Sequence, residues 1–303
     1  MSSPLIIVKP VTITSGMLVS SSVPEADYAE WSAGTTYALG ARVRVTSDHK
    51  VYQSAAASNV GNTPASTLGI WWNEVGPTNR WKCLDTSNST QTAQAYSISY
   101  RLSPGQGVTA LAVLNLVGGI SGRVRVIHPM LGTLYDFEHD LSTLPDEASY
   151  WSWCFGERTS PPQLIDLNLP GIPGCDILLD LTGTSALAVG VLLIGEQREI
   201  GEGVVQGASA ELRDYSKYIE NGYGDIVLKQ GQFAKDIRFK VAVLREHTDD
   251  AFEYLVTLRA TPCLFIGSPT MRLLTAFGFI QNVPVQMPAN AVHEIDFYVK
   301  ATA

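Results

Sequence analysis

Short runs in which apolar and polar residues alternate are the pattern that most restricts the fold of this chain. They recur in ARVRVTS (41–47), KVYQS (50–54), GRVRVIHP (122–129) and DIRFKVAVL (236–244). A period of two is typical of half-buried β-strands, and turn residues such as Gly, Asp and Ser flank the first two runs. The sequence therefore predicts a mainly β protein.

The composition supports a folded chain and excludes two broad classes of protein. Charged residues make up 17 % of the 303 residues, while hydrophobic residues make up 45 % and aromatic residues 9 %. A disordered chain shows the reverse balance. The net charge is −8, and the densest basic patch is only Arg42 with Arg44. A nucleic-acid-binding surface requires a basic stripe, so we expect no nucleic-acid partner.

Targeting and membrane-spanning segments are not expected. The start MSSPLIIVKPVTIT has neither a basic region nor a cleavage-site pattern, so it does not read as a signal peptide. The uncharged stretches Val51–Asn73, Leu102–Gly122 and Leu273–His293 have apolar runs shorter than the roughly 20 residues that a spanning helix needs. Because these stretches combine low charge with Gly and Pro, we interpret them as β-segments that other subunits cover.

All six tryptophans lie in the first half of the chain, and four of them lie between Trp31 and Trp81. With the two alternating runs at 41–47 and 50–54, this clustering predicts a three-stranded antiparallel β-module over residues 27–78. A module of this size has few aliphatic residues, so aromatic rings must fill much of its core. An N-terminal arm, residues 1–26, precedes it and either joins the chain's own sheet or reaches a neighbour.

Two further domains are predicted after the module. Residues 79–196 contain apolar strands separated by turn residues, which predicts a β-sandwich of jelly-roll-like form. Residues 197–303 are predicted to be α+β. Their features are a hairpin with Asn221, Gly222 and Gly224 in its turn (or a short helix over Ala208–Ile219), three closing strands, and one helix. That helix is expected over Thr248–Ala260, with Thr248 as its cap and with Ala251, Phe252, Leu255 and Leu258 on one stripe.

The first module resembles chitin-binding-type carbohydrate-binding modules of families 5 and 12. The resemblance rests on Trp31, Tyr37 and Gly40, then the alternating strand, VYQS and the Trp71–Trp72 pair. Ala41 departs from the family, where an Asp is common. The segments NRWKCLD, SPGQGVTALAVLNL and IGEQREIGEGVVQGASAELRDYSKY resemble tail-region structural proteins of tailed bacteriophages. This second resemblance implies a virion protein that is assembled in the host cytoplasm and released by lysis.

The resemblance to a carbohydrate-binding module gives the candidate site, because aromatic rings stack on the flat faces of sugars. The glycan- or partner-binding candidates are Trp31, Tyr37, Tyr52, Trp71 and Trp72. Trp71 and Trp72 are adjacent, so on a strand one is expected inside and the other outside. Equally, these rings could form the core of a module that packs against neighbouring subunits.

Four other features carry alternatives. Trp81 suggests either a galactose-binding-like site or an aromatic plug at the sandwich end, and Trp151 and Trp153 suggest either a subunit contact or core. The three acids Asp136, Glu138 and Asp140 suggest either a calcium site or a solvated strand end. Cys154 and Cys175 are the only cysteines near enough to suggest a disulfide, although four free thiols are expected.

These observations predict a non-enzymatic structural component of a phage tail, baseplate or fibre-attachment region. No nucleophile elbow, P-loop or H-E-x-x-H motif occurs, and no cofactor, catalytic residue or metal site is expected. A glycan hydrolase stays open, because a pair of carboxylates leaves no sequence signature. The expected partners are other tail proteins, further copies in a ring or spike, and host-surface polysaccharide. The alternative is a free carbohydrate-binding protein.

Overall fold

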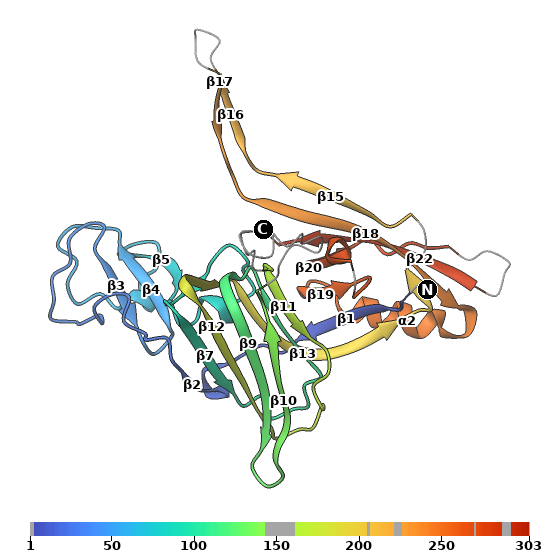
Figure 1. Ribbon diagram of the computed structural model, residues 1–303. Helices are drawn as coiled ribbons and strands as arrows, with labels where there is room; N and C mark the ends of the chain where they lie inside the picture. Colours follow the sequence, from blue (N-terminus) through green and yellow to red (C-terminus); the bar gives the residue numbers. More distant parts are fainter. Residues whose placement is uncertain are drawn as a thin grey trace, which may run out of the picture.

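The computed structural model describes residues 3–142, 161–204, 207–220, 226–269, 271–286 and 292–302. This part of the chain is mainly β, as predicted, with a small three-stranded sheet, a six-stranded sheet and a large curled sheet (Figure 1). The small sheet lies at one end of the molecule and the helix α2 (Thr248–Thr257) at the other.

The large sheet is antiparallel and contains eleven strands among the described residues. Nine of them form its main path. In spatial order these are β11 (Gln163–Asp166), β8 (Ala110–Leu114), β13 (Val191–Ile200), β1 (Leu5–Pro10), β19 (Cys263–Ile266), β20 (Thr275–Gln281), β22 (Val292–Ala301), β18 (Phe233–Leu244) and β14 (Gly203–Val204). Two more strands pair outside this path, β15 (Ser209–Asp214) with β18 and β21 (Val285–Gln286) with β22.

The second sheet packs against one half of the large sheet and completes a β-sandwich. Its strands are β10 (Gly132–Asp140), β9 (Val117–His128), β12 (Asp176–Val189), β7 (Ser97–Leu102) and β2 (Leu18–Ser21), with β6 (Thr92–Ala93) on β12. Alternate residues of both sheets fill one shared core, for example Leu111 and Ile194 from the large sheet against Val124 and Leu179 from the smaller one. The predicted sandwich is therefore present.

The expected domain boundary between residues 196 and 197 does not separate two folding units. It falls inside β13, and the large sheet runs from the sandwich into the C-terminal segment without interruption. The N-terminal arm joins this sheet as well, because β1 pairs with β13 on one side and β19 on the other. Leu5 and Ile7 are fully buried there, and this burial explains why the segment LIIV is apolar.

The predicted helix is present but begins and packs differently in detail. A single 3-10 turn, Arg245–His247, precedes α2, and His247 occupies the N-cap position. Thr248 is the first helical residue, and its hydroxyl donates to the Leu244 carbonyl instead of capping the helix. Ala251, Leu255 and Leu258 are buried, as expected. Phe252 is exposed, because at about 100° per residue it lies outside the narrow arc that Ala251, Leu255 and Leu258 share.

The Trp-rich module, residues 27–78, contains the three-stranded antiparallel sheet that the sequence predicts. Its order is β3 (Arg42–Val45), β4 (Lys50–Ser54) and β5 (Trp72–Pro77). The module has a core of its own, made of Val43, Tyr52 and Trp72. The two hairpin connections place the aromatic residues of β4 and β5 next to each other.

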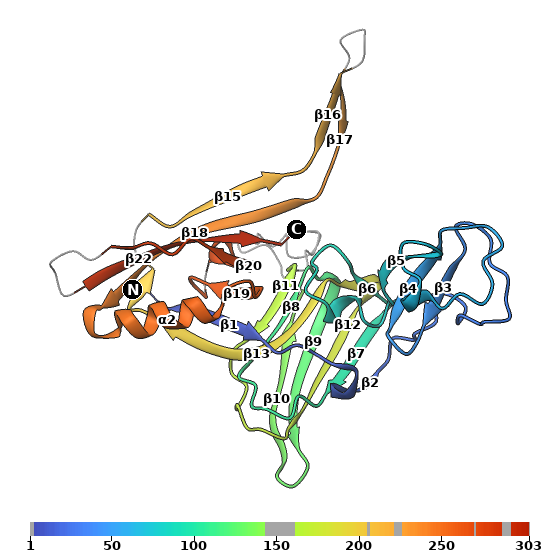
Figure 2. The ribbon, with the colours of Figure 1, turned by 180° about the vertical axis from the view of Figure 1, so that it is seen from behind.

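The predicted hairpin after residue 208 is also present and projects far from the body (Figures 1 and 2). β15 and β18 form its base, and β16 (Lys217–Glu220) with β17 (Ile226–Lys229) continues it outward. The alternative helix over 208–219 is wrong, because these residues form β15 and β16. We call residues 212–220 and 226–233 the projecting hairpin.

Candidate functional site

The structure divides the five aromatic candidates of the Trp-rich module into core and surface. Trp72 and Tyr52 are almost completely buried, so neither ring can contact a ligand directly. Trp31, Tyr37 and Trp71 pack against this core but keep part of their surface exposed. The expectation that one of the two adjacent tryptophans lies inside is confirmed.

Hydrogen bonds fix the orientation of the buried rings. The indole N–H of Trp72 donates to the Asn62 carbonyl at 2.9 Å, and the ring of Tyr37 meets the Trp72 ring edge-on with centroids 5.2 Å apart. The Tyr52 hydroxyl donates to Asp48, and burial together with this carboxylate raises the pKa of Tyr52 above its ordinary value. These contacts define a rigid aromatic core.

The loop between β4 and β5 is held by a buried asparagine. The side-chain N–H groups of Asn59 donate to the Ser54 hydroxyl and the Trp71 carbonyl, both at 3.1 Å, while its carbonyl oxygen accepts from Asn62 at 2.8 Å. Because Asn59 is fully buried, each of these groups needs a partner within the protein. The uncharged loop that the sequence shows is therefore ordered by its polar side chains.

Aliphatic residues dominate the apolar surface that the module leaves in solvent. The most exposed is Ile70, at 72 %, and the others are Leu39, Val60, Leu68 and Val75. Branched aliphatic side chains offer no flat ring on which a sugar could stack. Packing against another protein is the contact that such a surface favours.

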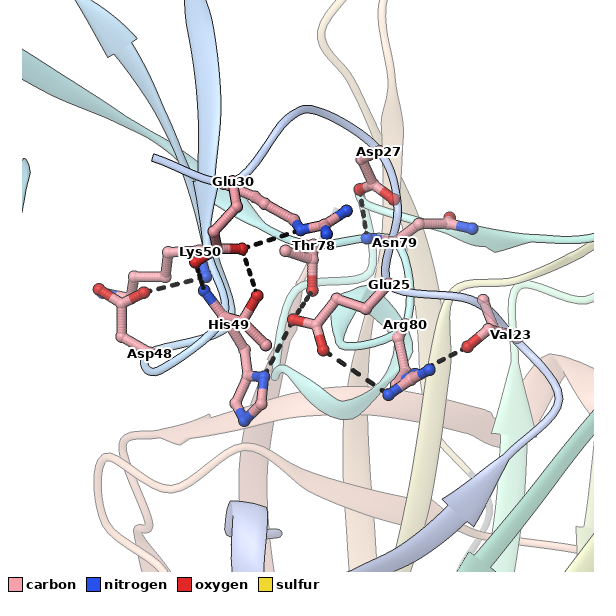
Figure 3. A network of polar contacts seen from close by, with 12 residues as sticks. Val23, Glu25, Asp27, Glu30, Asp48, His49, Lys50, Thr78, Asn79 and Arg80 are labelled. Carbon is pink, nitrogen blue, oxygen red and sulfur yellow. Dashed lines mark hydrogen bonds and ion pairs between the residues drawn. The ribbon is translucent and has the colours of Figure 1, made fainter. Parts of the chain in front are cut away.

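A polar network joins the Trp-rich module to the sandwich (Figure 3). Glu25, nearly buried, accepts from the Thr78 hydroxyl at 2.9 Å and lies 2.9 Å from Nδ1 of His49 in the turn between β3 and β4. Arg80 lies 3.7 Å from the other Glu25 oxygen and donates to the Val23 carbonyl at 2.7 Å. Glu25 therefore links the β3–β4 turn of the module to the segment that follows β5 and leads into the sandwich. We call these contacts of Glu25 with His49, Thr78 and Arg80 the clamp.

Trp81 lies at the same junction, where its ring stacks on the His49 ring with centroids 4.2 Å apart. It is therefore a contact between the module and the sandwich. Glu30, drawn in the same view, accepts hydrogen bonds from Arg44 and Thr46 (Figure 3). Slight burial works to raise the pKa of Glu30, but these hydrogen bonds hold it below the ordinary value.

The projecting hairpin carries apolar side chains that nothing in the described chain covers. Tyr218 and Leu228 pair directly across the two strands and are 74 % and 67 % exposed. Ile219, on the opposite face, is 54 % exposed. Leu212, Tyr215 and Phe233 continue this exposed apolar surface toward the base. The sequence predicted the hairpin itself. The alternation of apolar and polar residues did not show that both faces of the hairpin lie in solvent.

A second hairpin, β9–β10, ends in an exposed apolar turn. Met130 is 88 % exposed and Leu131 is also largely exposed. The backbone N–H groups of both residues donate to Nδ1 of His128 at 3.2 Å, and these bonds hold the turn in shape. Exposed apolar side chains on a turn of fixed shape form a surface to which another protein can bind.

Two buried aspartates were not anticipated from the sequence. Asp166 accepts from Tyr135 at 2.9 Å and lies 3.0 Å from Nε2 of His139. Burial works to raise its pKa, yet these hydrogen bonds hold it below the ordinary value, while burial and Asp166 raise the pKa of Tyr135 to about 12. Asp236 accepts from Arg213, from Tyr298 and from the backbone of Ala301. Both oxygens of each carboxylate accept hydrogen bonds within the protein, although the buried Nε of Arg213 has no partner among the described residues.

The calcium interpretation gains no support from the geometry. Asp136 forms a bidentate pair with Arg123 at 2.6–2.7 Å, which neutralises that carboxylate. Within the described residues, no group of three or more His, Cys, Asp or Glu side chains is arranged to hold a metal ion. None of the helices in this part of the chain is long and apolar enough to cross a bilayer.

Several sequence predictions fall outside the described residues. These are Trp151, Trp153, Cys154 and the turn at Asn221, Gly222 and Gly224. The other three cysteines, Cys83, Cys175 and Cys263, are free and buried.

Comparison of the chain with protein-family models, with curated proteins and with solved structures finds no match.

Proposed function

We propose that this protein is a non-enzymatic structural component of a multi-subunit particle, specifically the tail, baseplate or fibre-attachment region of a phage virion. The projecting hairpin is the observation that carries the proposal. A two-stranded ribbon without a third strand or a covering helix is marginally stable in water. Apolar residues on both of its faces are explained if neighbouring subunits bury them.

Two further surfaces support an assembly role. The apolar turn at Met130 and Leu131 lies at the end of the β9–β10 hairpin, and the aliphatic surface around Ile70 lies on the Trp-rich module. Each adds an exposed apolar region in a different part of the molecule. Several such regions on one chain are explained if it has several neighbours in an ordered particle.

The proposal is tested by mass spectrometry of purified virions from the phage that encodes the chain. The expected result is that the protein copurifies with particles at a fixed ratio to a known tail protein. A preparation of intact, infectious particles without the protein would contradict the proposal.

A glycan contact of the Trp-rich module is a second proposal, with a free carbohydrate-binding protein as the alternative function. It is favoured by the partly exposed rings of Trp31, Tyr37 and Trp71. Retention on chitin or host polysaccharide measures it. Trp71→Ala is the informative variant and should reduce retention, because Trp71 has ring surface to lose and Trp72 is core. A wild-type protein that is not retained would contradict the glycan contact.

A further inference from the structure

We propose that the projecting hairpin of one copy binds the outer face of α2 of a second copy. This inference rests on the proposed function, since it specifies how copies join. The outer face of α2 consists of Asp249, Phe252, Glu253 and Val256, and we call it the acidic helix face. All four residues are exposed.

The hairpin presents a pair of lysines beside an apolar residue. Lys217 pairs directly with Lys229 across the strands, and Ile219 lies two positions from Lys217 on the same face. Like charges directly opposite each other destabilise a strand pair. The isolated hairpin therefore carries a repulsion that an acidic partner would relieve.

The acidic helix face has the complementary arrangement. Asp249 and Glu253 are one turn apart, and like charges at this spacing destabilise a helix. Phe252 and Val256 form an apolar strip beside them, 39 % and 45 % exposed. No basic residue lies within α2 to offset the acids.

None of these four charges is neutralised within the described part of the chain. Lys217, Lys229, Asp249 and Glu253 form no ion pair there. In both views the hairpin points away from the body and from α2, so the two surfaces do not meet within one copy (Figures 1 and 2). Two complementary surfaces on different sides of the same chain define a head-to-tail contact, which generates a closed ring or an open filament.

Charge reversal with rescue tests this contact. One variant carries Lys217→Glu with Lys229→Glu, and the other carries Asp249→Lys with Glu253→Lys. Each alone places like charges against each other at every contact. In a mixture, the reversed hairpin of one variant meets the reversed helix of the other, while the two unaltered surfaces also match. Sedimentation velocity measures self-association of each variant and of the mixture.

Each variant alone is expected to self-associate at least about tenfold more weakly than wild type. The equimolar mixture should recover assemblies of wild-type size. Raising the salt from about 0.05 M to about 0.5 M should weaken the wild-type contact, because exposed charges are screened. Arg42→Glu with Lys82→Glu is the matched control for the hairpin variant, because it lowers the net charge by the same amount outside both surfaces and should leave assembly unchanged.

Three results would overturn the inference: a wild type that stays monomeric as its concentration rises, variants that still assemble, or a mixture that fails to recover. If the hairpin variant is lost from virions while it self-associates normally, the hairpin binds a different virion protein and the inference also fails. Presence of the wild type in particles is measured separately, so the proposed function can stand when this contact does not. Should the helix reversal unfold the chain, Asp249→Asn with Glu253→Gln replaces it as the weakening variant.

Discussion

The Trp-rich module and the projecting hairpin are both small antiparallel β-structures, yet they place their large side chains in opposite ways. The module has three strands and a loop that folds back over them, so Trp72 and Tyr52 become core. The hairpin has two strands that no other described segment covers, so Tyr218 and Leu228 remain in solvent. With a third strand and an ordered loop the module can form its own core. The hairpin lacks both, so we expect it to depend on a partner for burial.

The largest effect is expected at the centre of the module. Trp72→Ala removes the largest fully buried side chain of the described residues together with its hydrogen bond to Asn62, and should lower the free energy of unfolding by about 3–5 kcal/mol. Urea unfolding monitored by tryptophan fluorescence measures the change. A loss below about 1 kcal/mol would mean that the module does not depend on its aromatic core.

An intermediate effect is expected where the module meets the sandwich. Glu25→Gln keeps the size of the side chain but removes the carboxylate that His49, Thr78 and Arg80 contact, and should cost about 1–3 kcal/mol. Glu74→Gln is the control, because Glu74 forms only an exposed pair with Lys50, and it should cost less than about 1 kcal/mol. Equal losses in the two variants would argue against the clamp.

In the hairpin, a double substitution should change stability little and assembly much. Tyr218→Ser with Leu228→Ser removes one exposed cross-strand pair, so the free energy of unfolding of the monomer should fall by less than about 1 kcal/mol. This pair faces away from Lys217 and Lys229, so the assembly that it serves is the one with other virion proteins. Copurification with virions, measured by mass spectrometry, should therefore fall clearly. If stability drops as far as in Trp72→Ala, the hairpin has a hidden core and the comparison with the module fails.

The smallest effect concerns exposed carboxylates, one in each region. Hydrogen bonds from the Ser216 hydroxyl and backbone hold the pKa of Asp214 below 3.8, and those from Thr46 and Arg44 outweigh slight burial to hold the pKa of Glu30 below 4.5. Because both pKa values are lowered in the folded state, each charged form stabilises its region at neutral pH. That contribution is lost only as the pH falls below about 4.

Carboxyl NMR titration checks both values. Ser216→Ala should return the pKa of Asp214 toward 3.8, and Thr46→Val should do the same for Glu30 toward 4.5. Unchanged pKa values in these variants would show that the hydrogen bonds are not the cause.

The sequence predicted the strands well and their environment poorly. Alternation located β3, β4 and β18, and turn residues marked the hairpins, because both depend on local geometry. The uncharged stretches were expected to face other subunits. Instead β8 is buried within the chain's own large sheet, as is most of β20. Residues apart in sequence, such as those of β1 and β19, provide this burial, and alternation within a strand carries no information about them.

The candidate site shows the same limit. The aromatic residues of the module could be named from spacing alone, but which rings are core depends on a loop anchored by Asn59. The clamp at Glu25 joins residues more than fifty positions apart, and Asp166 meets His139 across two sheets. Asp249 and Asp250 lie in the first turn of α2, where acids are favourable, and the exposure of Asp249 beside Phe252 appears only in the structure.

The position of β1 has a consequence for the order of folding. Leu5 pairs with Ile200 and Ile6 with Ile266, so this strand has no neighbour until β13 has been made, and it lacks its second neighbour until β19 has followed. Contacts between residues so distant in sequence fold slowly, and an unpaired apolar strand is prone to aggregate in the meantime. Synthesis of this chain should therefore depend on chaperones that shield the segment LIIV until the large sheet can close around it.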